Sequence, residues 1–119
     1  MGDEQKYLKS IMFGRGAVIF REGDHADRAY LIDFGKVELS RMRDHDKQVV
    51  AIVADHHLFG EMALIDGGGR STDAVALLDT RCYVIDAEQF RIRLRATDGF
   101  IRTVMRVLCS HIRHMNDKL

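Results

Sequence analysis

The segment from Phe59 to Thr72 reads FGEMALIDGGGRST, and it decides how the chain is interpreted. A short helical turn leads into three glycines, then a cation and two hydroxyl groups. Gly60 lets a ligand approach the backbone closely, and the first turn of the helix that begins there offers unpaired N–H groups to an anion. Arg70 can donate a forked, charge-assisted pair of hydrogen bonds to phosphate oxygens, and Ser71 and Thr72 add neutral donors. The segment therefore predicts a phosphate site.

Glu61 has the wrong charge for this anion. A carboxylate beside a phosphate repels it, so we expect Glu61 to point away from the anion and to accept hydrogen bonds from sugar hydroxyls, braced by Arg70. Ribose is the natural candidate for that sugar. The residues thus favour a sugar phosphate as the ligand.

The surrounding sequence is typical of an all-β structure. Between Ala17 and Asp86, short apolar runs alternate with period two and are separated by turn signals about every ten residues, which favours a sandwich or a roll. From Ala87 the spacing becomes helical. It predicts a short helix from Ala87 to Arg95 and a longer one from Phe100 to about Asp117, whose apolar stripe comprises Ile101, Val104, Leu108, Ile112 and Met115. A first helix around residues 5–12 is a further expectation.

Composition limits the function classes. The 119 residues are 46% hydrophobic, with 18 basic and 18 acidic side chains, which describes an ordinary globular protein without a general attraction to nucleic acid. Neither a signal peptide nor an apolar run long enough for a membrane span is visible, so we expect a cytoplasmic location and no membrane association. Cys82 and Cys109 are isolated and are interpreted as buried, reduced thiols.

The segment FGEMAL, followed six residues later by Arg70 and Ser71, resembles the phosphate-binding cassette of cyclic-nucleotide-binding domains. Upstream, residues 16–24 (GAVIFREGD) and the later Tyr30 and Gly35 resemble the first strands of the same family. The resemblance extends over about residues 13–116. It implies one domain over residues 1–119, mainly β with flanking helices: an antiparallel β-roll (a double-stranded jelly roll) over about 13–86, with a short phosphate-binding helix, and C-terminal helices over about 87–117.

The resemblance also implies the site and the ligand. The ligand is a cyclic nucleotide, with cAMP expected and cGMP left open, and the chain carries no catalytic residues, no cofactor and no metal. Glu61 would hold the ribose 2′-hydroxyl, Arg70 and Ser71 the cyclic phosphate, and Gly60 and Ala63 would offer backbone donors. The implied ligand-binding set is Gly60, Glu61, Met62, Ala63, Arg70, Ser71 and Thr72.

The last helix is expected to cover the base and to signal by moving. Ile112 and Met115 would supply apolar contact, and either Arg113 or Asn116 would reach a ring edge. An effector protein, or a second copy pairing through this helix, would receive the signal. We expect either a stand-alone sensor without an output domain or a ligand-binding part of a larger protein, with no nucleic acid bound by this chain alone.

Three residues depart from the family pattern. Gly69 replaces a common proline, which predicts a flexible loop that is costly to order; Asp73 brings an acid close to the anion; and His56 stands where a turn glycine is common. These departures bear on affinity more than on identity.

Two other classes share the β-roll. A cupin-like metal enzyme is suggested by His57, Glu61 and Gly68, but His56 and His57 are adjacent and would face opposite sides of a strand, and no second histidine motif follows. His111 and His114, three apart on the last helix, are interpreted as exposed polar residues. A haem sensor would need His25 or His45 as an axial ligand, and an iron–sulfur sensor is excluded because two cysteines cannot supply four ligands.

Overall fold

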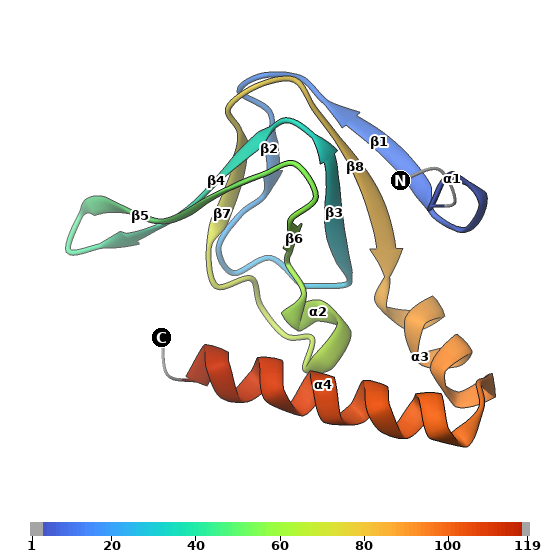
Figure 1. Cartoon of the computed structure of the whole chain (residues 1–119). Helices are drawn as coiled ribbons and strands as arrows, with labels where there is room; N and C mark the ends of the chain where they lie inside the picture. Colours follow the sequence, from blue (N-terminus) through green and yellow to red (C-terminus); the bar gives the residue numbers. More distant parts are fainter. Residues whose placement is uncertain (1–3, 118–119) are drawn as a thin grey trace.

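The computed structural model describes the backbone of residues 4–117 and the side chains of residues 6–115. Two four-stranded antiparallel sheets face each other and form a β-roll, with helices at one end (Figure 1). The first sheet has the order β1-β8-β3-β6, from the strands Lys9–Phe13, Thr80–Asp86, Arg28–Phe34 and Leu58–Phe59. The second has the order β2-β7-β4-β5, from Val18–Phe20, Asp73–Ala76, Lys36–Arg43 and Asp46–Ala54. The predicted fold class is confirmed.

Alternating side chains of the two sheets meet in the core. Ile32 and Cys82 of the first sheet and Val37 and Ala74 of the second have no exposed surface. Next to them, the rings of Tyr30 and Phe59 stack with centroids 5.2 Å apart, and the Phe20 ring lies 6.1 Å from that of Phe59. This aromatic group fills the end of the roll that faces the short helix α2 (Met62–Ile65) and so supports the segment singled out in the sequence.

The N-terminal segment differs from the sequence-based expectation. Only Glu4–Tyr7 is helical (α1), and β1 follows at once, pairing along its whole length with β8. The helix expected over residues 5–12 is therefore wrong beyond residue 7, and the sheet begins four residues before residue 13. Cross-strand pairing outweighed the helical spacing of this short segment because β8 offers it an open edge.

The turn before β6 explains His56. Its φ is +67°, in the left-handed region where glycine is favoured, and its N–H donates to the carbonyl of Ile32 over 2.7 Å. The departure from glycine noted in the sequence therefore falls on a position whose backbone requires positive φ. We infer that the hydrogen bond to β3 holds histidine in this conformation.

Two helices close the chain. α3 (Ala87–Ala96) begins at Asp86, whose carboxylate accepts a hydrogen bond from the Gln89 N–H over 2.9 Å, and α4 (Gly99–Asp117) follows a two-residue break. Both agree with the predicted ranges. Neither these helices nor the other described ones are long and apolar enough to cross a membrane.

The packing of α4 corrects a further expectation. The helical spacing predicts that Ile101, Val104 and Leu108, one part of the apolar stripe, pack on the β-roll, but these side chains are 39–50% exposed. Instead α4 contacts α2, and its half-buried positions are Arg102, Met105, Cys109 and Ile112. Because α4 rests on short helices rather than on a sheet, only one edge of its apolar stripe is covered. Cys109, expected to be buried, is half-buried for the same reason.

Candidate functional site

The site is formed where the first sheet ends and the chain crosses to the second. β6 ends at the buried Phe59, the chain turns through Gly60 with φ +70°, and α2 forms a single turn. A glycine loop then carries the chain to Arg70 and into β7. Of the predicted backbone donors, the Ala63 N–H already donates to the Gly60 carbonyl, over 3.2 Å.

Arg70 is the central side chain of the site. Only 7% of its surface is exposed, and its guanidinium lies 4.1 Å from the centroid of the Phe20 ring. One terminal nitrogen donates to the Arg28 carbonyl over 2.7 Å and the other to the Gly60 carbonyl over 3.3 Å. Its Nε is buried and has no hydrogen-bond partner in the described part of the chain. The arginine is thus held between β3 and the start of α2, with spare donor capacity.

The backbone around Arg70 is fixed as firmly as its side chain. The Arg70 N–H donates to the Asp24 carbonyl over 2.7 Å, and its own carbonyl accepts from the Gly23 N–H over 2.8 Å. These bonds tie the residue to the turn between β2 and β3. The position of the cation is therefore set by two turns that lie far apart in the sequence.

Burial makes the charge of Arg70 costly. Desolvation lowers the pKa of its guanidinium from its usual value, although nearby Tyr30, Asp27 and Asp24 counteract this. The guanidinium stays protonated because an arginine pKa starts so high. A buried cation whose hydrogen bonds go only to neutral carbonyls would gain from an anion placed beside it.

Glu61 begins α2 and is only half-buried. It is the N-cap residue of the helix, but its side chain makes no capping hydrogen bond. Among the ion pairs of the described residues, none joins Glu61 to Arg70, so the expected bracing is wrong. The cause is visible in the partners of Arg70: its terminal nitrogens are engaged by backbone carbonyls. The Glu61 carboxylate is left to accept other donors.

The hydroxyl residues after Arg70 differ in exposure. Ser71 is exposed and Thr72 half-buried, so both can be reached from outside. Asp73, the acid expected close to the anion, accepts a hydrogen bond from the Glu22 N–H over 2.7 Å. Its carboxylate is therefore engaged with the turn after β2.

The glycine loop forms a turn that bonds to the segment between β2 and β3. Gly67 and Gly68 have φ values of +68° and +80°, and the Ala26 N–H donates to the Gly68 carbonyl over 2.7 Å. Gly69 forms a β-bridge with His25. Gly67 and Gly68 supply the positive φ that this turn requires, whereas the flexibility expected of the loop stays a prediction.

The predicted base-covering residues lie on two sides of α4. Ile112 is half-buried, and Arg113 forms an ion pair with Asp66 of the glycine loop over 2.8 Å. Met115 is 67% exposed. The side chain of Asn116 lies outside the described residues. Arg113 thus links the last helix directly to the loop that precedes Arg70.

Sequence reasoning missed the groups that hold Arg70. The Arg28 and Gly60 carbonyls are backbone atoms and carry no sequence signature. The buried Phe20 beneath the guanidinium lies on a strand that the family resemblance of residues 16–24 predicted. From the sequence, Asp66 is expected only as the first residue of the turn over residues 66–69. Its spacing from Arg113 gives no sequence signal, because the two are brought together by tertiary packing.

The residues considered for a cupin-like metal site or a haem site do not lie together in the described structure. In the described chain, no three histidine, cysteine or acidic side chains form a group suited to a metal ion. The His57 ring nitrogen lies 3.2 Å from the Ala54 carbonyl, within its own turn. His25 and His45, the conceivable haem ligands, are exposed and lie on different turns.

Comparison with known proteins supplies the family. The sequence model of the cyclic nucleotide-binding domain matches residues 11–96. A CRP-like cAMP-activated global transcriptional regulator of Mycobacterium tuberculosis is 30% identical over 115 residues, which cover 96% of this chain and 51% of that regulator. The chain thus spans about half the length of this curated relative.

Solved structures agree with this result. The catabolite activator protein of Thermus thermophilus superposes with a TM-score of 0.77 at 28% identity, covering 97% of this chain and 55% of that one. The cAMP-bound form of EAL enzyme Bd1971 gives 0.71 at 34% identity, covering 92% of this chain and 30% of that one. With the family match over residues 11–96, the β-roll and the buried Arg70 beside Gly60, these similarities show that the chain belongs to the cyclic nucleotide-binding domain family.

Proposed function

We propose that the chain binds a 3′,5′-cyclic nucleoside monophosphate, cAMP in the first place, and acts as a sensor rather than as a catalyst. In this proposal Arg70 and Ser71 hold the cyclic phosphate and Glu61 accepts a hydrogen bond from the ribose 2′-hydroxyl. Gly60, Met62, Ala63 and Thr72 complete the wall around the sugar phosphate. The cAMP-bound and cGMP-bound forms of EAL enzyme Bd1971 support a cyclic nucleotide as the ligand class.

The observation that carries the proposal is the unsatisfied buried cation. Arg70 is almost fully buried, its Nε has no partner among the described residues, and its terminal nitrogens donate only to carbonyls. A phosphate that replaces the 3.3 Å bond to Gly60 gives the guanidinium a charged acceptor without requiring it to leave the Phe20 ring. The ligand therefore gains a charge-assisted hydrogen bond and loses only a weak neutral one.

Glu61 supports a ribose rather than a second anion. Its half-buried carboxylate makes no capping hydrogen bond and no described ion pair, so it is available to accept from a hydroxyl. A deoxyribose would leave this acceptor without its donor. A linear 5′-monophosphate carries more negative charge and a different phosphate position, so it should bind much less well.

Signalling would pass through α4. The Arg113–Asp66 ion pair joins this helix to the glycine loop two residues from Gly68, next to the proposed phosphate site. A nucleotide that orders the loop can therefore act on α4 through this pair, and a base lying below Ile112 would act on it directly. Only ligand contacts that differ between two positions of the helix can shift their populations.

A melting experiment tests the ligand assignment. At a hundredfold excess over its dissociation constant, cAMP should stabilise the fold by about 2.7 kcal/mol, and 5′-AMP at the same concentration should do much less. For a domain of this size the melting temperature should rise by roughly 10 °C. If neither cAMP nor cGMP shifts the melting temperature at millimolar concentration, the ligand assignment is wrong.

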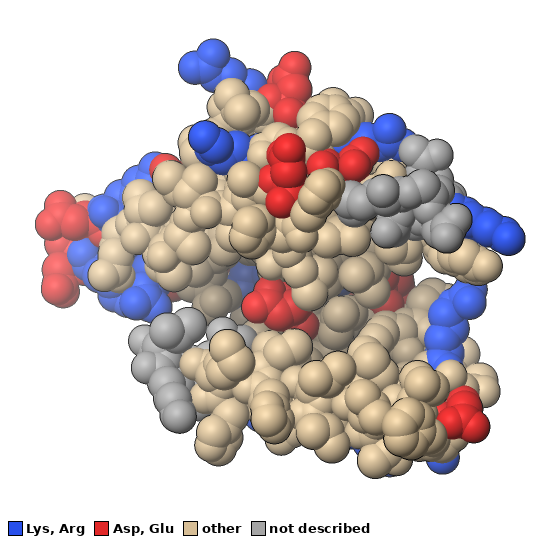
Figure 2. Space-filling view, in the orientation of Figure 1, with Lys and Arg blue, Asp and Glu red and all other residues tan. Residues whose placement is uncertain are grey.

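We also propose that the uncovered face of α4 pairs with a second copy of the chain. Ile101, Val104, Leu108, His111 and Met115 recur at alternating steps of three and four, the spacing of a two-stranded coiled-coil seam. These side chains are exposed, and the face of α4 that is turned to the viewer is largely without charged groups (Figure 2). Pairing would cover the apolar edge that α2 leaves open.

A further inference from the structure

A second cavity lies away from the nucleotide cassette. It has a volume of about 700 Å³ and is bounded by the N-terminal segment, the end of β8, α3 and the first turn of α4. These elements lie together on one side of the molecule (Figure 1). No residue of the segment 59–72 lines it. Its size falls within the range that holds small organic ligands.

The walls of this cavity are apolar. Val84 of β8, Phe90 and Leu94 of α3, and Leu8 of the N-terminal segment are half-buried and line it together. Ile101, at the start of α4, closes one end. Side chains from four elements thus present a hydrocarbon surface that the remainder of the described chain does not cover.

The charges at this cavity favour an anion. Lys9 and Arg93 line it, and in the described part of the protein neither side chain makes a hydrogen bond or ion pair. A third cation, Arg28, is paired with Asp27 at 3.2 Å. The acid that lines the cavity, Asp86, is engaged as the N-cap of α3. The free charges are therefore positive, and Arg93 can bind a carboxylate with a forked pair of hydrogen bonds.

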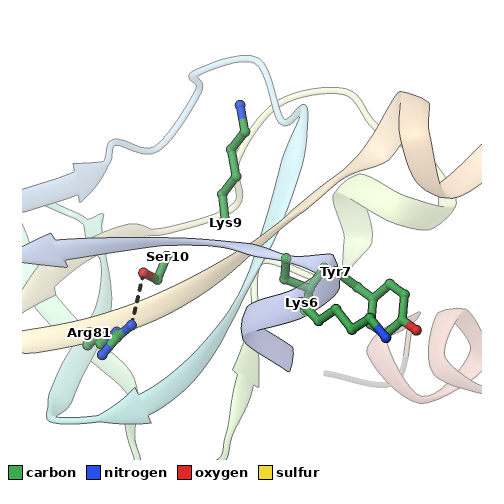
Figure 3. Close-up of a pocket in the computed structure, with 6 residues that line it drawn as sticks. Lys6, Tyr7, Lys9, Ser10 and Arg81 are labelled. Atoms are coloured by element: carbon green, nitrogen blue, oxygen red, sulfur yellow. Dashed lines mark hydrogen bonds between the residues drawn. The ribbon is translucent and has the colours of Figure 1, made fainter. Parts of the chain in front are cut away.

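A neighbouring cavity also has cations in its lining, but it lacks the other features of a carboxylate site. This hollow of about 550 Å³ shares Tyr7, Leu8 and Lys9 with the cavity of about 700 Å³ and is also lined by Lys6 and Arg81 (Figure 3). Its cationic side chains point in different directions: Arg81 bonds to Ser10, Lys6 lies on the Tyr7 ring, and Lys9 extends away from both. Because these cations point in different directions and the apolar lining of the hollow is limited to Tyr7 and Leu8, it carries no proposal.

We propose that the cavity between β8, α3 and the N-terminal segment binds a free medium-chain carboxylate, with its alkyl chain on Val84, Phe90 and Leu94 and its carboxylate on Arg93 and Lys9. The site is independent of the nucleotide cassette. Because Ile101 belongs to the first turn of α4, the alkyl chain of the bound molecule touches the same helix that the nucleotide is proposed to move. The carboxylate would therefore act as a second input to α4.

Calorimetric titration of the complete chain with decanoate, below its micelle-forming concentration, tests this proposal. We expect saturable binding, at least about tenfold weaker for the uncharged decanol, and amide shifts at Val84, Phe90 and Leu94 in nuclear magnetic resonance spectra. Arg93→Gln should weaken decanoate binding about tenfold or more, since it removes the charge-assisted bond. Arg95→Gln is the matched control, because Arg95 is an exposed arginine on the same helix that does not line the cavity.

The result also separates this site from the nucleotide site. Arg70→Ala should leave decanoate affinity unchanged whether or not the chain binds cAMP. Absence of saturable binding, equal affinity for decanol, or equal losses in Arg93→Gln and Arg95→Gln would each overturn the proposal. Decanoate competing with cAMP for the cassette would overturn it as well.

Discussion

At the residue scale, the glycine loop offers a matched pair of substitutions. Gly68 has φ +80°, so Gly68→Ala should lower the free energy of unfolding by roughly 1–2 kcal/mol. Gly69 does not have positive φ, and a Cβ there would lie 3.5 Å from the Gly23 carbonyl oxygen, an ordinary contact. Gly69→Ala should therefore raise the free energy of unfolding by about 0.4–1 kcal/mol, because alanine restricts the conformations of the unfolded chain. Urea unfolding of both variants measures this, and equal effects would show that the loop does not have the described conformation.

The buried thiol of Cys82 should make the stability of the fold depend on pH in the alkaline range. Burial raises the pKa of the Cys82 thiol to about 12, whereas the Cys109 thiol is only half-buried. Since the folded state binds this proton more tightly than the unfolded state, its stabilising contribution is present below pH 9 and is lost as the pH rises towards 12. Burial also raises the pKa of Tyr30, which adds a loss of the same sign.

We therefore expect urea unfolding to show a smaller decline in stability between pH 8 and pH 10.5 for Cys82→Ala than for the parent chain. Cys109→Ala serves as the control and should decline like the parent. Alkylation of the folded chain should modify Cys109 first. A Cys82→Ala variant with the same pH dependence as the parent would contradict the role of that thiol.

The sequence predicts the role of a residue when its side chain forms the site, and not when the contacts are made by backbone atoms. Arg70 and Glu61 were identified from residue type and spacing. The sequence did not reveal that the Arg70 guanidinium lies on Phe20 and bonds to backbone carbonyls, because carbonyl acceptors look the same at every residue. The expected contact between Glu61 and Arg70 failed for that reason.

At the element scale, α4 is expected to be a ligand-responsive helix. Its contact with the site includes one half-exposed ion pair, Arg113–Asp66, which contributes about 0–1 kcal/mol. Because this ion pair contributes so little, residues 107–115 should exchange their amide hydrogens readily in the absence of ligand. Saturating cAMP should slow this exchange, and truncation from Ser110 onward should reduce affinity while leaving the β-roll folded. Equal exchange with and without cAMP, together with unchanged affinity of the truncated chain, would show that the helix is only structural.

Helices and strands were predicted well where local sequence signals set their ends. They were predicted poorly where the conformation depends on a segment that is distant in the sequence. α3 and α4 begin and end within one residue of the predicted ranges, because the break between them is marked by Thr97, Asp98 and Gly99. β1 was assigned to a helix because its partner, β8, follows some seventy residues later. The outward face of α4 could not be foreseen either, since the stripe is the same whether it meets a sheet, a short helix or another molecule.

At the scale of the whole molecule, the seam of α4 should make the chain self-associate. Sedimentation velocity is expected to show a dimer whose fraction rises with concentration, and Leu108→Asp should give a monomer because it places a charge at the centre of the seam. Thr103→Asp is the control: Thr103 is exposed on α4 but lies off the seam. A parent chain that stays monomeric at high concentration, or a Thr103→Asp variant that dissociates as fully as Leu108→Asp, would contradict pairing through this face.

The central claim is that Arg70 and Glu61 form a cyclic-nucleotide site. Calorimetric titration with cAMP of the parent chain, Arg70→Ala, Glu61→Ala and the control Arg41→Ala tests it most directly. Arg41 bonds to Gln48 on the β4–β5 hairpin and should be neutral. Arg70 also packs on Phe20, so each variant is first checked for folding by its melting curve; Glu61, which makes no capping bond, keeps the test valid if Arg70→Ala unfolds.

The account predicts that Arg70→Ala binds cAMP roughly a hundredfold or more weakly, that Glu61→Ala also loses affinity, and that Arg41→Ala matches the parent. Folded Arg70→Ala and Glu61→Ala variants that bind cAMP as tightly as the parent chain would contradict it.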